Sequence, residues 1–187
     1  MGKLWTINAQ INTIYFSKKS SWEKPFRNDR KWQENIYMTA VSDNPDDQIV
    51  SGSIDNFNLT VNAGDTIQWI ISELNPVHSK KINICMYGLI AGENWKKNLP
   101  NIKISHNNII LSSVKHYFNS AEKPTAEFIS LDFVNTSIPS IEIINKKLDE
   151  KISYNINIAL VNIENIMEPE ILNYMQLDSY FFITPSM

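Results

Sequence analysis

The segment Val61-Asn-Ala-Gly-Asp-Thr-Ile-Gln-Trp-Ile-Ile-Ser-Glu-Leu74 indicates the fold of this chain more clearly than any other stretch. Gly64 and Asp65 are residue types that favour a tight turn. Directly after them, apolar side chains occupy every second position, which is the period of a largely buried β-strand: Ile67, Trp69 and Ile71. We therefore predict a turn that leads into a central strand.

Another apolar segment, residues 53–61, precedes this turn and carries Ile54, Phe57 and Leu59. Two strands that flank a short turn with glycine are typical of a hairpin. We therefore predict that the segments before and after residues 62–65 pair with each other.

The two-residue period recurs along most of the chain, while the period of an amphipathic helix is nearly absent. We predict further strands at residues 5–15, 36–41, 81–87, 128–134, 138–144, 152–161 and 180–184. Residues 109–118 fit either a strand or a short helical turn. The predicted fold class is all-β with little helix, an antiparallel β-sandwich of jelly-roll or immunoglobulin-like type formed by one domain over residues 1–187.

The composition is that of an ordinary globular protein, with 43% hydrophobic and 20% charged residues and a formal net charge of -3. This balance favours neither disorder nor a nucleic-acid partner. No apolar run is long enough to span a bilayer, so no membrane partner is expected. Cys85 is the single cysteine and the start lacks an apolar signal core, which together predict a cytoplasmic location.

An acidic turn at residues 43–47 is the candidate metal site. Asp43, Asp46 and Asp47 supply three carboxylates within five residues, and calcium prefers several oxygen ligands. The turn lacks the glycine and the terminal glutamate of an EF-hand loop. The alternative interpretation is a solvated surface turn.

Tryptophans in predicted loops are candidates for carbohydrate binding, because sugars stack their apolar faces on aromatic rings. The three candidates are Trp22, Trp32 and Trp95. The first two lie in the basic, aperiodic segment 17–35, which is also typical of a long surface loop with aromatics packed onto a sheet.

Sequence patterns for catalysis are not found. The five glycines form no phosphate-binding loop, and no Gly-x-Ser-x-Gly elbow is present. The three histidines fall at unrelated spacings that do not favour a zinc site. Cys85 lies within an alternating strand, so we interpret it as a packing residue. We therefore assign no catalytic residue and no cofactor apart from the candidate calcium ion.

Several motifs occur together in an order that resembles one known family, the PixA/AidA inclusion body proteins. They are Tyr37-Met38, Ser51-Gly52 with Asp55, the strand Gly64-Asp65-Thr66-Ile67-Gln68-Trp69, Tyr154 to Ile158, and Tyr174 with Leu177-Asp178-Ser179-Tyr180. The match spans most of the chain, and its most specific part is Gly-Asp-x-Ile-x-Trp. The chain departs from the family where Leu177 and Ser179 replace the tryptophan and proline of Trp-Asp-Pro-Tyr, and where Leu148-Asp149-Glu150 replaces a glycine turn.

This resemblance implies a non-enzymatic bacterial protein that self-associates into cytoplasmic, often paracrystalline, inclusions. It implies no catalytic residues. The motif residues Gly64, Asp65, Trp69, Asp178 and Tyr180 are expected to be structural, since an aspartate beside a turn or strand end commonly accepts bonds from nearby backbone amides. A lectin-like carbohydrate-binding module that uses the acidic turn and the loop tryptophans is the alternative function.

Overall fold

The computed structural model describes residues 2–19, 31, 34–75, 81–117, 125–144, 149–165 and 167–185, without the side chains of 106–117 and 125–137. The chain forms two compact units, one made of residues 1–103 and 139–187 and the other of residues 104–138. Two compact units can belong to one folding domain or to two. The single domain over residues 1–187 therefore stays a prediction.

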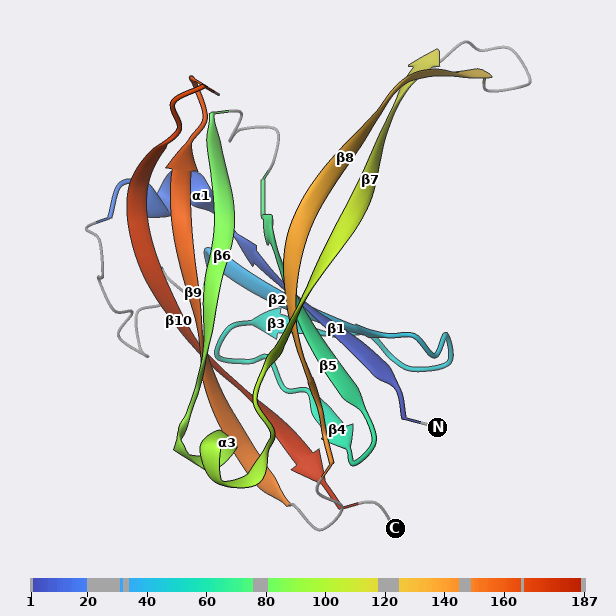
Figure 1. Ribbon diagram of the computed structural model, residues 1–187, viewed down its shortest axis with the longest axis vertical. Helices are drawn as coiled ribbons and strands as arrows, with labels where there is room; N and C mark the ends of the chain where they lie inside the picture. The colour runs from blue at the N-terminus through green and yellow to red at the C-terminus, as the bar shows by residue number, and fades with distance from the viewer. Residues whose placement is uncertain are drawn as a thin grey trace. The chain divides into compact units, whose positions relative to one another are not determined.

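Six strands form the first sheet, which we call sheet A (Figure 1). Their order is β3 (Val50–Ser53), β2 (Ile36–Ser42), β1 (Leu4–Ile11), β5 (Thr66–Glu73), β8 (Thr125–Glu142) and β7 (Lys103–Tyr117). Among the described residues, the first unit also contains the short helices α1 (Thr13–Phe16) and α3 (Glu93–Asn98). Strand β1 ends before α1 because the side chain of Asn12 caps this helix by accepting from the amide of Tyr15.

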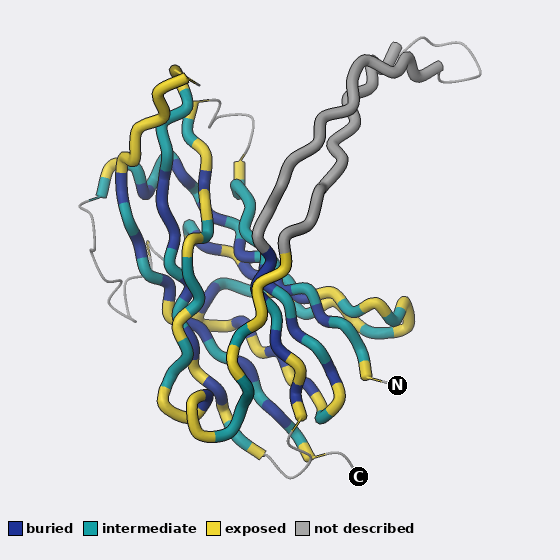
Figure 2. The backbone as a smooth tube through the Cα atoms, viewed as in Figure 1, coloured by how far each residue is buried: buried dark blue, intermediate teal, exposed yellow. Residues whose placement is uncertain are grey.

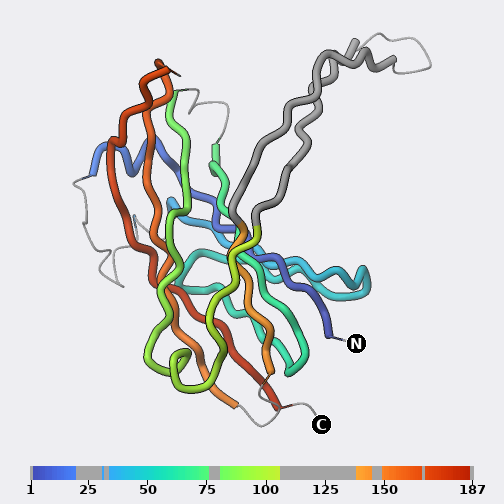
Figure 3. The backbone as a smooth tube through the Cα atoms, in the orientation of Figure 1, coloured from blue at the N-terminus to red at the C-terminus, as the bar shows by residue number. Residues whose placement is uncertain are grey.

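Four strands form the second sheet, sheet B. Their order is β4 (Thr60–Asn62), β10 (Glu170–Thr184), β9 (Glu150–Asn162) and β6 (Ile82–Ala91). Strands β6, β9 and β10 lie side by side as neighbours in Figure 3. Strand β9 runs between two partners, which explains why its predicted apolar face is buried throughout.

The core lies between the inward faces of the two sheets. Buried residues alternate with intermediate or exposed ones along much of β1, β9 and β10, as the changes of colour in Figure 2 show. The sequence period predicted these faces correctly: Trp5, Ile7, Ala9 and Ile11 of β1 are buried, as are Ile152, Tyr154, Ile156, Ile158 and Leu160 of β9. Interior packing of such residues is the main stabilising contribution to a fold of this kind.

The predicted hairpin at residues 62–65 is wrong. Strand β4, before the turn, pairs with β10 in sheet B, whereas β5, after it, pairs with β1 and β8 in sheet A. The turn is therefore a corner that carries the chain from one sheet to the other. A local pattern of apolar residues and a turn does not distinguish these two geometries, because the partner strands are far away in the sequence.

The sheets are mixed, which corrects the prediction of an antiparallel sandwich. Strands β1 and β5 are parallel, with Ile7 opposite Trp69, and β4 is parallel to β10. The all-β class with little helix is confirmed, while neither a jelly-roll nor an immunoglobulin-like topology is shown. Parallel pairing requires a long crossover, and the chain between β1 and β5 provides one.

Residues 109–117, whose sequence fits either a strand or a short helical turn, belong to strand β7. The predicted strands at 128–134 and 138–144 are parts of the single strand β8. None of the helices in the described ranges is both long and apolar enough to cross a membrane.

Gly64 provides the first test of the corner. Its φ angle is +94°, a conformation that residues with a side chain rarely adopt. We expect Gly64→Ala to lower the free energy of unfolding by about 1–2 kcal/mol. Urea denaturation followed by tryptophan fluorescence would measure this loss.

The control is Gly88→Ala, since Gly88 has no positive φ and a methyl group there would contact the Asn157 side chain at an ordinary 3.4 Å. We expect this variant to change stability by less than about 0.5 kcal/mol. Equal losses in both variants would contradict the role assigned to the conformation of Gly64.

Candidate functional site

The Asp65 carboxylate, in the most specific motif of the chain, joins the two sheets at the corner. Its Oδ1 accepts from the amide of Lys3 at 2.9 Å, and its Oδ2 accepts from the amide of Asn62 at 2.9 Å. Lys3 directly precedes β1, and Asn62 ends β4. Asp65 is only 3% exposed. Both oxygens bind backbone amides, which is the arrangement expected of a structural aspartate beside a turn.

The start of the chain packs closely against this corner. The amide of Thr66 donates to the carbonyl of Lys3 at 2.7 Å. A Cβ atom on Gly2 would lie 1.6 Å from the carbonyl oxygen of Gly64, so only glycine fits this approach. The first residues of the chain are thus fixed by the same turn that connects the sheets.

The acidic turn also binds the start of the chain. Asp43 accepts from the amide of Leu4 at 2.9 Å, and Asp47 accepts from Lys3 Nζ at 2.6 Å. This bond lowers the pKa of the Asp47 carboxyl and raises that of the Lys3 ammonium. Asp46 is exposed. Two of the three predicted calcium ligands therefore have partners within the protein.

Metal coordination requires several ligands that converge on one point. Within the described ranges, no group of three histidine, cysteine, aspartate or glutamate side chains is placed to hold a metal ion. The calcium site at Asp43, Asp46 and Asp47 stays a prediction, without support from this arrangement.

Trp69 lies at the centre of a cluster of buried rings between the sheets. Its ring centroid is 5.7 Å from that of Trp95, 5.4 Å from that of Tyr154 and 6.4 Å from that of Phe181. These rings come from β5, α3, β9 and β10, so the cluster connects both sheets and the helix. Tilted and edge-on contacts of this kind are favourable beyond the area that they bury.

The Tyr154 hydroxyl is the main titratable group inside this cluster. Burial raises the pKa of Tyr154 to about 12, and the neighbouring Ser179 and Trp69 side chains partly counter this rise. Neither the Tyr154 hydroxyl nor the Trp69 indole nitrogen makes a hydrogen bond of normal geometry. A phenol that stays protonated at neutral pH in a closed core is not placed for acid–base catalysis.

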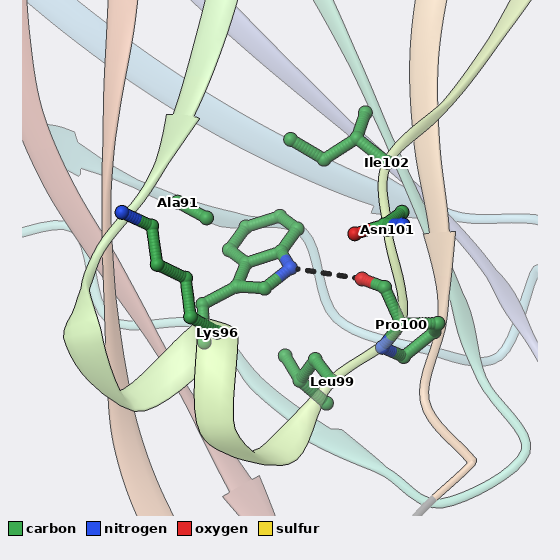
Figure 4. A pocket seen from close by; sticks show the side chains of 7 residues that line it. Ala91, Lys96, Leu99, Pro100, Asn101 and Ile102 are labelled. Carbon is green, nitrogen blue, oxygen red and sulfur yellow. Dashed lines mark hydrogen bonds between the residues drawn. The ribbon is translucent and has the colours of Figure 1, made fainter.

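A small pocket of about 150 Å³ lies beside Trp95, between the end of β6, helix α3 and the following segment (Figure 4). The Trp95 indole nitrogen donates to the carbonyl of Pro100 at 3.1 Å. Small-molecule sites usually enclose about 300–1,000 Å³. Lys96 is the one charged residue in its lining, so the pocket offers no acid–base pair.

The expectation that Trp95 is an exposed aromatic for sugar stacking is wrong. Trp95 is 1% exposed, because α3 turns its ring into the core against Trp69 and Tyr154. Trp22 and Trp32 lie outside the described residues. Carbohydrate binding therefore has no support from the described part of the chain.

Cys85 is also placed differently from the expectation that it packs in the core. It lies in β6 on the face opposite to buried Ile84, and it is exposed. Partial burial raises the pKa of its thiol, so it is not an activated nucleophile. The alternation predicted along β6 is correct, but Cys85 belongs to the outward set.

The outer face of sheet B carries a belt of amide side chains, which the sequence analysis did not single out. Gln176 Nε2 donates to Asn157 Oδ1 at 3.1 Å. Asn155, with its amide nitrogen turned toward Asp178, donates to Oδ1 of that residue at 2.6 Å. Asp178 is exposed and accepts from a side-chain amide. This partner differs from the backbone amides expected for it.

Aromatic pairs flank this belt on both sides. Tyr87 of β6 and Tyr174 of β10 meet edge to face, with centroids 5.8 Å apart, and Tyr180 and Phe182 form a similar pair at 5.6 Å. Lys151 Nζ lies 3.5 Å from the centroid of the Tyr180 ring. Tyr180 is partly exposed, unlike Trp69, and its hydroxyl donates to the carbonyl of Asp55 at 3.5 Å. Alternation along β9 and β10 was the signal that could have identified this face.

Comparisons with known proteins support the fold. The chain matches no family model and no curated protein. Among solved structures it is similar to the crystal structure of the inclusion body protein PixA from Burkholderia cenocepacia J2315, with a TM-score of 0.63 over 98% of this chain and 97% of that chain. The identity is 12%, so this likeness shows the fold alone. The resemblance to PixA predicted from the motifs is confirmed at this level.

Asp65→Ala tests the corner carboxylate. The variant leaves the amides of Lys3 and Asn62 without their acceptor, so we expect the free energy of unfolding to fall by about 1–3 kcal/mol. Chemical denaturation would measure it, with Asp46→Ala as the control at an exposed carboxylate. A loss in the control as large as that in Asp65→Ala would contradict a specific role for Asp65.

Asp47→Asn tests the ion pair with Lys3. The folded state lowers the pKa of Asp47, so its stabilising effect is present above its ordinary pKa of 3.8 and disappears as the pH falls through the lower folded value. We expect wild type and variant to differ more in melting temperature at pH 7 than near pH 2–3. A difference that does not change with pH would be inconsistent with this ion pair.

Proposed function

We propose that this chain is a non-enzymatic protein that self-associates into inclusions in a bacterial cytoplasm. The observation that carries the proposal is a fold shared with an inclusion body protein over 98% of the chain. A fold can host many functions, so the surface must also be suited to this role.

The outer face of sheet B is suited to contacts between copies. Its belt of amides both donates and accepts hydrogen bonds, so identical faces can satisfy each other. Lys151 and Asp178 carry opposite charges on this face, and the whole chain has a net charge of only -3. Copies of the chain therefore approach each other without strong repulsion.

Exposed apolar side chains add to this surface. Tyr87 is 48% exposed and Ile90 42%, and both lie on β6 at the edge of sheet B. Apolar side chains that gather at one edge mark an interaction surface more often than isolated ones do. In the described part of the chain, the pocket beside Trp95 gives a catalytic role no comparable support, because it is small and Lys96 is the one charged residue in its lining.

Expression in a bacterial cytoplasm tests the proposal. We expect ordered particles of folded protein that redissolve without denaturant into native oligomers. Electron microscopy would show the order, and analytical ultracentrifugation would give the oligomer mass. The buried Trp69 and Trp95 should keep a blue-shifted emission in the redissolved protein, because their rings remain in the core.

The control is Trp69→Ala, which removes the centre of the ring cluster and should cost about 3–5 kcal/mol of stability. We expect its aggregates to be disordered and to dissolve only in denaturant. Wild-type protein that stays monomeric and freely soluble at high concentration would refute the proposal.

A further inference from the structure

Strand β6 is the longest sheet edge in the unit formed by residues 1–103 and 139–187. Within the described residues it pairs with β9 alone, and it spans the ten residues Ile82–Ala91. The other edges described in this unit are shorter: β3 and β4 have four and three residues, and β5 lacks β8 as a partner after Gln68. A long edge presents a row of unpaired backbone groups that can bind a further strand.

Strand β6 is unusual in composition for a ten-residue edge. It contains no charged residue and no proline, although 20% of the chain is charged. The short edges β3 and β4 are also uncharged, whereas the interior strands β5, β9 and β10 each carry at least one charged residue. Proteins usually protect an exposed edge with lysine, proline or a very short strand. Only a bulge between Met86 and Gly88 interrupts this edge.

The outward backbone groups of β6 can be assigned from its register. The amide of Ile163 donates to the carbonyl of Lys81 at 2.8 Å, one position beyond the Ile82–Asn162 pair at which the β6–β9 ladder begins. Because bonding alternates in an antiparallel pair, the peptide groups of Ile82, Ile84 and Met86 point away from β9.

Within the described residues, no backbone hydrogen bond joins this outward side of β6 to another element. The amide of Ile84 has a local partner, the side-chain oxygen of Asn83 at 2.8 Å. A local side-chain bond of this kind is one that an incoming strand can replace.

We infer that the outward edge of β6 pairs with β6 of a second copy of this chain, antiparallel about a two-fold axis near Ile84. The inference rests on the proposed self-association and names its contact. A strand paired with itself in this way is self-complementary, because each outward amide meets an outward carbonyl of the partner. Since β6 is uncharged, its own copy meets no like charge across the pair.

The same pairing covers apolar surface. Cys85, Tyr87 and Ile90 are exposed on β6, next to the edge that would be joined. Two copies related by the axis bring these side chains together on one continuous sheet. The paired sheet has eight strands, four from each copy. The two uncharged β6 strands then lie at its centre and are no longer edges.

Lysine substitutions test this contact by analytical ultracentrifugation. Cys85→Lys places two like charges near the axis, so we expect the dissociation constant of the dimer to rise by about tenfold or more. Tyr87→Lys serves as a second variant on the same strand. The matched control is Thr60→Lys, which adds the same charge at the opposite, three-residue edge β4. Cys85→Ser controls for the loss of the thiol.

The distance between the two β6 strands of a dimer can be tested with the native thiol of Cys85. Near the axis, the two Cys85 side chains lie directly opposite or diagonally, within about 5–8 Å. A short bifunctional thiol reagent should therefore join wild-type protein into dimers. The control places the only cysteine at Thr60→Cys in a Cys85→Ser background, where we expect little cross-linking.

The outcomes separate this inference from the proposed function. Assembly that is unchanged in Cys85→Lys and Tyr87→Lys, or lost equally in Thr60→Lys, overturns pairing through β6 while self-association stands. Equal cross-linking through residues 60 and 85 likewise overturns it. A wild-type chain that remains monomeric overturns both. Selective loss in the two β6 variants, together with cross-linking through Cys85, supports the inference.

Discussion

The corner at residues 62–65 depends on a single buried carboxylate. Asp65 accepts one hydrogen bond from the amide of Lys3, just before β1 of sheet A, and one from the amide of Asn62, which ends β4 of sheet B. Removing the carboxylate would leave these two amides without their acceptor at the point where the sheets are joined. Gly64 supplies the left-handed backbone and Gly2 the close approach that this corner requires. The most specific motif of the chain, Gly64 to Trp69, therefore connects the two sheets.

The ring cluster around Trp69 connects the two sheets within the core, as Asp65 does at the corner. Trp69 follows Asp65 by four residues along β5, and its ring meets side chains from α3, β9 and β10. The position of the corner thus fixes where the central tryptophan enters the core. Trp95, which was a candidate for sugar binding, belongs to this cluster, so the aromatic residues here are better explained by packing than by recognition.

In the described part of the chain, the face and edge of sheet B are better candidates for an interaction site than the acidic turn or the pocket beside Trp95. The acidic turn binds the start of the chain, and the pocket beside Trp95 is small. By contrast, sheet B presents an amide-rich outer face and ends in an uncharged ten-residue edge. These features fit contacts between identical copies, in which hydrogen bonds and apolar contacts repeat by symmetry. The proposed self-association would therefore use extended surfaces, which catalytic sequence motifs do not mark.

The sequence by itself identified most of the strands and the buried faces of β1 and β9, because a two-residue period is a local property. It left residues 109–118 open, predicted only the last part of β10 and extended the first strand into α1. It also predicted the structural role of Asp65 and the likeness to PixA. Only the tertiary structure decided that the segments around Gly64 belong to different sheets, that β1 and β5 are parallel, that Trp95 points inward and that Cys85 points outward. These features depend on pairing between residues far apart in the chain, and no local pattern encodes the partner.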